Sequence, residues 1–354
     1  MRIDRQQAFS GTMASDIDAA ALEAYLAGHV AGFAGPLEVE RFKGGQSNPT
    51  YKLTARSSCY VLRRKPFGKL LPSAHAIERE YRVTAALAEA GFPVARPLHL
   101  CTDDTVIGAA FYVMEHAAGR VFWEPHAPGL SGDGRAKLFG SLNATIAGLH
   151  RFDPATLGLS DFGRPAGYVA RQIRRWSEQY RASETETIPE MDRLIAWLPG
   201  ACPADPEPAI VHGDFRLDNC IIHPTEPRVI AVLDWELSTI GDPLADFTYH
   251  LMQWFMPLSE TGAGVGSLLG HEHEPGLPAI HDYAADYCRR TGRDGISHLP
   301  VYMAYNFFRL AAILQGILGR VRDGTAANAE AAVMAQQVRP LAATAWRFAR
   351  EAGA

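Results

Sequence analysis

Cysteine is scarce in this chain of 354 residues, and the five cysteines present are not arranged for cross-linking or for metal binding. None forms a CxxC pair and their number is odd, which disfavours both a disulfide framework and a structural zinc site. Basic residues are not in excess either, since the formal net charge is −5 and the pI is about 6.2. We therefore expect a reduced, cytoplasmic protein whose partners include neither nucleic acid nor a membrane.

Long apolar runs are also missing. The segment MRIDRQQAFSGTMASDIDAAALEAYL has early acidic residues and no apolar core, which is unlike a signal peptide. No uninterrupted apolar run reaches the roughly 18 residues that suggest a membrane-spanning helix. Hydrophobic residues nevertheless make up 47% of the chain, enough to build a sizeable core. The length predicts two domains or one two-lobed enzyme.

The first third of the chain has the pattern of an antiparallel sheet with one helix. Strand-forming residues alternate with glycine-containing turns, and a helical segment ends before Gly91 and Pro93. The first predicted strand begins at 37 and ends in a tight loop at Gly44 and Gly45. Further strands are predicted over 51–55, 59–64, 98–101 and 111–115, and the helix covers 73–90. Residues 1–16 are predicted to be mobile, followed by a short helix over 17–28 that Ser15 or Asp16 would cap.

The rest of the chain is predicted to be mainly helical. Helical patterns cover 138–150, 168–183, 191–198, 243–255, 280–291, 299–318 and 328–349. Short apolar strands are predicted at 210–212, 221–222 and 229–233. The segment 258–278 is rich in Gly, Pro and His and is typical of a long loop or lid. It contains His271-Glu-His273-Glu, for which a solvated loop is favoured over a metal site because the spacing is not HExxH.

The strongest chemical signal is VHGDFRLDNCII at residues 211–222. Asn219 follows Asp214 by five residues, and a second apolar strand ends at Asp234 fifteen residues later. Phosphoryl transfer from ATP requires a carboxylate near the acceptor hydroxyl and oxygen ligands that hold magnesium on the phosphates. Each of these three side chains has the right chemistry and stands where a strand gives way to a loop. The set is far more specific than a lone HGD.

The sequence resembles the aminoglycoside phosphotransferase/choline kinase family, which has a protein-kinase-like fold. Within it, the chain looks most like the kinase-like branch associated with acyl-CoA dehydrogenases. The matching segments are FKGGQSNPTYKL (42–53), YVLRRKPFGKLLPSAHAIEREYRV (60–83), VHGDFRLDN (211–219) and VLDWELSTIGDPLADFTYH (232–250). The resemblance implies a two-lobed α+β fold. Residues 1–116 would form a β-rich nucleotide-binding lobe, and residues 117–354 a helical lobe with the catalytic loop and the acceptor site.

The resemblance also implies roles for the motif residues. Asp214 would be the catalytic base, and Asn219 and Asp234 would hold Mg²⁺, with a second metal contact from Glu236. His212 would support the catalytic loop, although a structural histidine bonded to backbone is the reading that we favour. Asp242 and Asp246 in GDPLADF are expected to tie the loop to the helical lobe rather than to act in catalysis.

Nucleotide contacts are expected from two further segments. Gly44, Gly45, Gln46, Ser47 and Asn48 would form the phosphate-covering loop, although paired glycines also occur in plain hairpin turns. Met114, Glu115 and His116 would present backbone groups to adenine, or form an ordinary strand end.

The basic anchor of the phosphates departs from the kinase pattern. Kinases carry a lysine on the third strand, paired with a helix glutamate, whereas YVLRRK offers Arg63 there and Lys65 two residues later. Both lie on one strand face. We favour Arg63, because its permanent charge and bidentate geometry suit phosphates. Glu80 is its expected partner, and Glu78 is expected to be solvated.

The acceptor is predicted from charge and apolar content. From residue 251 onward there are nine acidic residues, nine arginines and no lysine, so no acidic cleft is expected for a polycationic aminoglycoside. The aromatic residues in this region favour a partly apolar alcohol, such as a hydroxyacyl-CoA or a hydroxy acid. We expect no acyl-CoA dehydrogenase activity, because the kinase-like match takes up residues 20–350.

Three functional hypotheses follow. The leading one is a small-molecule kinase that uses ATP and Mg²⁺, with GTP as the alternative nucleotide. The second is a catalytically silent module that binds a nucleotide or a partner, and the third is a metal-dependent hydrolase using His212, Asp214 and Asp234. Nothing in the sequence sets the oligomeric state, and a homodimer is one option.

Overall fold

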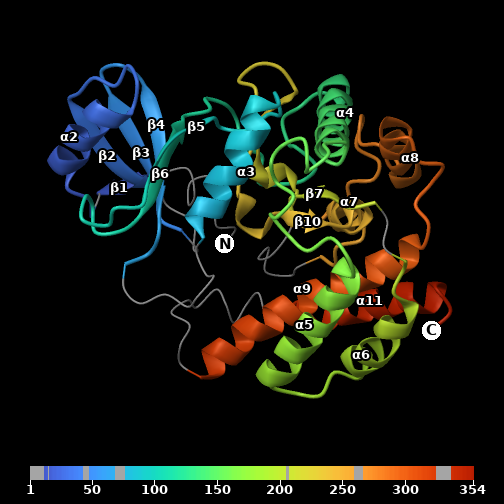
Figure 1. The fold of residues 1–354 in the computed structure, drawn as a ribbon. Helices are drawn as coiled ribbons and strands as arrows, with labels where there is room; N and C mark the ends of the chain where they lie inside the picture. Colours follow the sequence, from blue (N-terminus) through green and yellow to red (C-terminus); the bar gives the residue numbers. More distant parts are fainter. Residues whose placement is uncertain are drawn as a thin grey trace, which may run out of the picture. The chain divides into compact units, whose positions relative to one another are not determined.

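The computed structural model describes residues 12–14, 16–42, 48–67, 76–204, 207–258, 266–323 and 336–354 (Figure 1). The chain forms two compact units. The first comprises Met1–Trp123, Leu157–Leu159 and Asn219–Ser238, and the second comprises Glu124–Thr156, Ser160–Asp218 and Thr239–Ala354. The boundary expected at residue 116 or 117 falls within the first unit. Because the chain changes unit between Asp218 and Asn219, the HGDxxxxN motif is divided between the two units.

An antiparallel sheet of six strands forms the first unit, in the order β1-β2-β3-β4-β6-β5. Its strands are β1 (Thr12–Ala14), β2 (Leu37–Phe42), β3 (Thr50–Ala55), β4 (Cys59–Arg64), β5 (Pro97–Cys101) and β6 (Phe111–Glu115). The unit also contains α2 (Ala19–His29), α3 (Ile77–Glu89), the 3₁₀ turn η2 (Trp235–Leu237) and the hairpin of β8 (Cys220–Ile222) and β9 (Val229–Val232). The hairpin is tied to the rest of the unit by bridges from Val232 to Val94 and from Ile222 to Arg120.

The two faces of this sheet are buried by different helices. On one face Leu22 and Leu26 of α2 pack with Leu62, Phe111 and other apolar strand residues. On the other face Ile77 of α3 packs with Tyr112. The alternation of strand side chains explains this division, because neighbouring residues of β6 point to opposite faces. α3 also contacts η2, which fixes the segment after β9 beside the sheet.

The second unit is mainly helical. Its helices are α4 (Gly132–Leu149), α5 (Tyr168–Ser183), α6 (Pro189–Ala201), α7 (Pro243–Leu251), α8 (Ile280–Thr291), α9 (Leu299–Arg322) and α11 (Val338–Glu351), together with the 3₁₀ turn η3 (Met252–Trp254). The strands β7 (Ala209–Val211) and β10 (Thr239–Gly241) pair antiparallel. The 3₁₀ turn η1 (Leu217–Asn219) crosses the boundary between the units.

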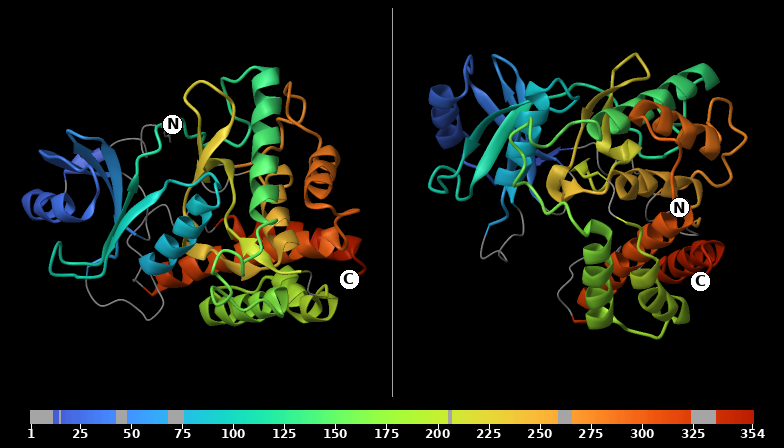
Figure 2. Two further views of the ribbon diagram at one scale, coloured as in Figure 1. Left: turned by 45° about the horizontal axis from the view of Figure 1, so that its top comes forward. Right: turned by 45° about the vertical axis from the view of Figure 1, so that its right-hand side comes forward.

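Helix α9 is the core helix of the second unit. It packs against α5, α7 and α11, and Figure 2 shows α5 and α11 alongside it. By length and composition alone it could cross a membrane, but 83% of its most apolar window is buried within the protein. Its apolar residues therefore serve the packing of the helices around it.

The expected fold class is confirmed, and several local predictions need correction. The segment 1–16 is not wholly mobile, because Thr12–Ala14 pairs with β2. Asp16 does not cap the first helix: it accepts hydrogen bonds from Tyr51 and Arg64, and Asp18 is the cap of α2. Strand β10 was not predicted. The expected start of the predicted helix over 73–90 lies outside the described residues. Residues 259–265 of the predicted loop over 258–278 also lie outside them.

Candidate functional site

Arg63 on β4 lies among three carboxylates of the first unit. Its Nε is 3.0 Å from Oε2 of Glu80, and its terminal nitrogen is 3.0 Å from Oδ1 of Asp234 and 3.6 Å from Oε2 of Glu236. The carboxylates come from α3 and from the segment that follows β9. With all four groups ionised the cluster carries a net charge of −2, which suits a further, divalent cation.

Glu80 is the buried member of this cluster, with only 2% of its side chain exposed. Burial raises the pKa of Glu80, while Arg63 opposes that shift. Burial also disfavours the charge of Arg63, but Glu80 and the other carboxylates outweigh it and raise the pKa of the guanidinium. Glu80 further accepts hydrogen bonds from Asn48 Nδ2 at 2.9 Å and from the Tyr112 hydroxyl at 3.2 Å. The buried carboxylate oxygens of Glu80 are thus paired with several fixed donors.

The neighbouring cation, Lys65, has a different partner. Its amino group forms an ion pair with Glu78, which is half-exposed. The expectation that Glu78 is simply solvated is therefore wrong. Each basic residue on this strand face has its own glutamate on α3, and it is Arg63 that reaches Asp234.

Asp234 stands at a strained point of the backbone. Its φ of +63° and ψ of +64° lie in the left-handed region, which is uncommon for residues other than glycine. Such strain persists only where surrounding structure enforces it, and it gathers at functional sites. The preceding residue, Leu233, donates its backbone N–H to the carbonyl of Asn219 at 2.8 Å. The two predicted metal ligands, Asn219 and Asp234, are therefore brought together at one end of the β8–β9 hairpin.

Asp214 belongs to the second unit and is held by two side chains. The Tyr249 hydroxyl donates to its Oδ1 at 2.7 Å, and Arg216 Nε lies 3.2 Å from the same oxygen. Arg216 also pairs with Asp218 at 3.1 Å. Arg309 of α9 donates to the carbonyl of Gly213 at 3.0 Å. Sequence reasoning missed these partners. Tyr249 has a detectable signal, since it follows Asp246 by three residues within one predicted helix.

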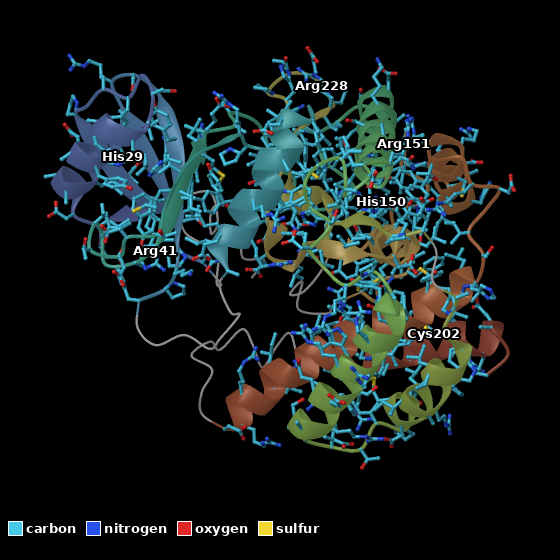
Figure 3. The ribbon with its side chains drawn as sticks, in the orientation of Figure 1. His29, Arg41, His150, Arg151, Cys202 and Arg228 are labelled. Atoms are coloured by element: carbon cyan, nitrogen blue, oxygen red, sulfur yellow. The ribbon has the colours of Figure 1, made fainter. Side chains whose placement is uncertain are left out.

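His212 is fully buried, and its contacts fit a structural role in the loop. Its Nδ1 accepts a hydrogen bond from the Asp214 backbone at 3.2 Å, and its own N–H donates to Asp246 at 2.7 Å. Asp246 also accepts from Gly213 N at 2.8 Å and lies 3.1 Å from Nε2 of His150, which is labelled in Figure 3. Burial opposes the charge of Asp246, but its hydrogen bonds from His150 and His212 outweigh burial and lower the pKa of the carboxyl.

The other predicted nucleotide contacts lie in varied settings. Gly44 to Ser47 lie outside the described residues, and Asn48 is buried against Glu80. In the segment of Met114, Glu115 and His116, the N–H of Glu115 donates to the Arg96 carbonyl at 2.9 Å, so the sheet already uses that group. Burial lowers the pKa of His116. Their roles toward a nucleotide stay predictions.

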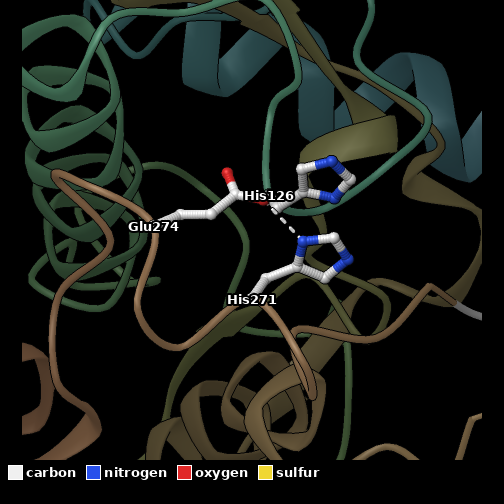
Figure 4. Close-up of side chains that lie close together, drawn as sticks. All are labelled: His126, His271 and Glu274. Atoms are coloured by element: carbon white, nitrogen blue, oxygen red, sulfur yellow. Dashed lines mark hydrogen bonds and ion pairs between the residues drawn. The ribbon is translucent and has the colours of Figure 1, made fainter.

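A separate cluster joins His271 and Glu274 to His126 in the second unit (Figure 4). Nδ1 of His271 is 2.6 Å from Glu274, whose other oxygen is 2.8 Å from Arg135. The rings of His126 and His271 stack at 3.8 Å with an interplanar angle of 8°. Lone pairs in parallel planes do not converge on one ion, and Arg135 already supplies a cation. We therefore assign the cluster to packing of the loop, which is not merely solvated as expected.

Comparisons with known proteins show the family to which the chain belongs. The model of a family described as the phosphotransferase enzyme family matches residues 38–293. Acyl-CoA dehydrogenase family member 10 of Mus musculus is 43% identical over 97% of this chain, which covers 32% of that protein. Acyl-CoA dehydrogenase family member 11 of Rattus norvegicus is 43% identical over 94% of this chain and 43% of its own length. The chain thus spans less than half the length of these curated relatives.

Solved structures confirm the fold. A protein from Ralstonia eutropha JMP134, described among the aminoglycoside phosphotransferases, is 48% identical, with a TM-score of 0.85 over 95% of this chain and 99% of its own. A spectinomycin phosphotransferase bound to ADP and spectinomycin has a TM-score of 0.60 over 96% of this chain and 99% of its own. At 12% identity, that likeness concerns the fold alone. The resemblance predicted from the motifs, including its branch, is confirmed.

Proposed function

Because the chain belongs to the phosphotransferase enzyme family, we propose that it is a small-molecule kinase that moves the γ-phosphate of ATP to an alcohol. GTP is the alternative donor, and we propose a cytoplasmic site of action. The observation that supports this most directly is the cluster around Arg63, in which one guanidinium contacts Glu80, Asp234 and Glu236. The net negative charge of this cluster suits a metal ion, and the Arg63 guanidinium suits the phosphates that the metal would accompany.

The donor set fits magnesium. Asp234 and Asn219, with Glu236 as a further contact, offer the carboxylate and amide oxygens that Mg²⁺ prefers. When bound, the ion would neutralise charge on the transferring phosphoryl group. Arg63 would turn part of its donor fork from Asp234 toward the phosphates, while Glu80 continues to orient it.

Asp214 is the proposed general base. The acceptor hydroxyl oxygen forms its bond to the γ-phosphorus, the bond from that phosphorus to the β–γ bridging oxygen breaks, and ADP leaves. The hydroxyl proton passes to the Asp214 carboxylate. The hydrogen bond from Tyr249 and the contact with Arg216 hold this carboxylate in place for the step.

The acceptor that we propose is a hydroxyacyl-CoA or a related hydroxy acid. The curated relatives carry acyl-CoA dehydrogenase names, which makes an acyl-CoA derivative a reasonable substrate for a kinase-like region of the same proteins. The equal numbers of acidic residues and arginines after residue 250 favour it over a polycationic aminoglycoside. Dehydrogenase activity is not part of the proposal.

The test is a phosphorylation assay with ATP and Mg²⁺ across hydroxyacyl-CoAs, free hydroxy acids, choline-like alcohols and aminoglycosides, read by product mass. We expect one acyl class to be phosphorylated and Asp214→Asn to lower kcat by roughly 10³-fold, the range of general base catalysis. Asp133→Asn is the matched control, because that carboxylate is exposed and pairs with Lys137 in the same helix turn. If aminoglycosides are the only compounds phosphorylated, the proposed acceptor class is wrong.

A silent module is the alternative, and one contact favours it. The ion pair between Arg63 and Asp234 occupies a carboxylate that a kinase needs for its metal. In its nucleotide-binding form, this alternative predicts that ATP with Mg²⁺ raises the melting temperature while no acceptor is phosphorylated. If ATP changes neither melting nor turnover, both the kinase hypothesis and this nucleotide-binding form fail.

A further inference from the structure

Three residues of helix α7 lie within hydrogen-bond distance of the loop around Asp214. Asp246 accepts the N–H groups of residues 212 and 213, at 2.7 and 2.8 Å. Tyr249 donates to the Asp214 side chain at 2.7 Å, and Nδ1 of His250 lies 3.3 Å from the Phe215 carbonyl. Positions separated by three and four residues share a helix face. One face of α7 therefore fixes the loop backbone and the Asp214 side chain together.

We propose that Tyr249 is a positioning residue that holds the Asp214 carboxylate in one orientation for proton abstraction. The inference rests on the proposed function and names a residue that acts through the base. Asp246 and His250 fix the loop backbone, whereas Tyr249 reaches the reacting side chain itself. A hydrogen bond from a neutral donor to a carboxylate stabilises the charged form and fixes the rotation of the carboxylate.

The Tyr249 hydroxyl can only act as a donor here. Burial raises the pKa of this phenol, and the neighbouring Asp214 charge raises it further, so it keeps its proton at neutral pH. A buried neutral phenol beside a carboxylate donates its hydrogen, which is the arrangement that favours the deprotonated base.

Arg309 supports Tyr249 from a second helix. Its guanidinium carbon lies 5.2 Å from the centroid of the Tyr249 ring, and its terminal nitrogen donates to the Gly213 carbonyl at 3.0 Å. Arg309 is itself buried, with 7% of its surface exposed. A cation over the ring face attracts it and holds the ring in place. Helices α7 and α9 thus converge on the same loop residues.

The charged and titratable groups around the carboxylate come from three elements. The loop itself contributes His212 and Arg216, α7 contributes Tyr249, and α9 contributes Arg309. Among these four side chains, Tyr249 can lose a single heavy atom, its hydroxyl oxygen, without the loss of a charged or ionisable ring or guanidinium group. Tyr249→Phe is therefore the cleanest substitution.

Tyr305→Phe is the matched control. Tyr305 is also a buried tyrosine beside Arg309, on α9, but its hydroxyl has no hydrogen-bond partner among the described residues. Both variants lose one buried hydroxyl, and only one loses a contact with Asp214. The comparison separates positioning of the base from a general effect of removing a phenol oxygen.

We expect Tyr249→Phe to lower kcat roughly 10-fold, with the KM for ATP within about twofold of the wild-type value. Tyr305→Phe should leave both kcat and the KM for ATP at their wild-type values. Equal kcat values in Tyr249→Phe and wild type would overturn the inference.

A second measurement is independent of the acceptor. With ¹³C-labelled aspartate, the Asp214 carboxyl signal is identified by its absence in Asp214→Asn, and its position is measured in the folded protein without substrate. The signal should shift in Tyr249→Phe, which loses the hydrogen bond, and keep its wild-type position in Tyr305→Phe. An unchanged signal in Tyr249→Phe would overturn the inference. If wild type phosphorylates no acceptor, the proposed function fails, while this signal still decides whether Tyr249 positions the Asp214 carboxylate.

Discussion

Removal of the Arg63 cation tests the electrostatic centre of the first unit. Replacement of Arg63 by Met keeps an unbranched side chain of similar reach but leaves Glu80, which is 2% exposed, without its counter-ion. Breaking a buried ion pair from one side costs about 3–5 kcal/mol, because the remaining charge is uncompensated. Asn48 and Tyr112 still donate to Glu80, so we expect the lower end, about 3 kcal/mol of unfolding free energy.

Two further variants make this expectation specific. Lys65→Met removes a cation from the same strand face, but its pair with Glu78 is 29% and 39% exposed, so the loss should be under about 1 kcal/mol. The double variant Arg63→Met/Glu80→Gln should recover most of the lost stability, because a neutral amide needs no counter-ion and can still bond to Asn48 and Tyr112.

Urea unfolding at pH 7 without nucleotide provides the measurement. Repeating the urea unfolding at pH values down to 5 tests the expected direction of the pH dependence. The pKa of Glu80 is already raised by burial, and it rises further without Arg63, so the carboxyl takes up a proton on acidification. The stability difference between Arg63→Met and wild type should therefore shrink as the pH falls. Equal losses in Arg63→Met and Lys65→Met, or no recovery in the double variant, would refute the reasoning.

Two other predictions concern the second unit. Burial lowers the pKa of His250 from 6.5 to about 4. Between these pH values the unfolded chain binds a proton at this residue and the folded protein does not. Unfolding free energy should fall by roughly 3 kcal/mol between pH 6.5 and 4, and an undiminished slope in His250→Gln would contradict this. A Cβ on Gly276 (φ +82°) would lie 1.8 Å from the Gly132 carbonyl oxygen, whereas one on Gly270 (φ +85°) would meet nothing within 4 Å. Gly270→Ala should thus cost about 1 kcal/mol and Gly276→Ala clearly more, as denaturant unfolding would measure.

The sequence by itself determined the elements and the chemistry of the motif. Strand alternation placed Arg63 and Lys65 on one face, and Glu80 on the following helix was the expected partner of Arg63. That pair is present in the structure, because it depends on the period of one strand and one helix, whereas the pair of Lys65 with Glu78 was not predicted. The bounds of α5 and α8 agree with their predicted ranges, since both helices are amphipathic and end at clear signals.

Only the tertiary structure decided which residues surround these groups. The predicted motif gave no indication that Asn219–Ser238 belongs to the first unit, or that β10 pairs with β7. The contacts of Tyr249 and Arg309 with the Asp214 loop join residues that lie 35 and 96 positions apart. Short strands such as β10 carry too few residues for a period to be read, and their pairing depends on partners elsewhere in the chain.

The physical reason is the range of the interactions involved. Helix and strand periods, caps and turns act over a few residues, so the sequence displays them directly. Whether a buried carboxylate receives a phenol, a guanidinium or a backbone N–H depends on which faces the core brings together. Asp234 makes the difference plain: its residue type predicted a metal ligand, but its left-handed backbone and its ion pair with Arg63 follow only from the packing around the β8–β9 hairpin.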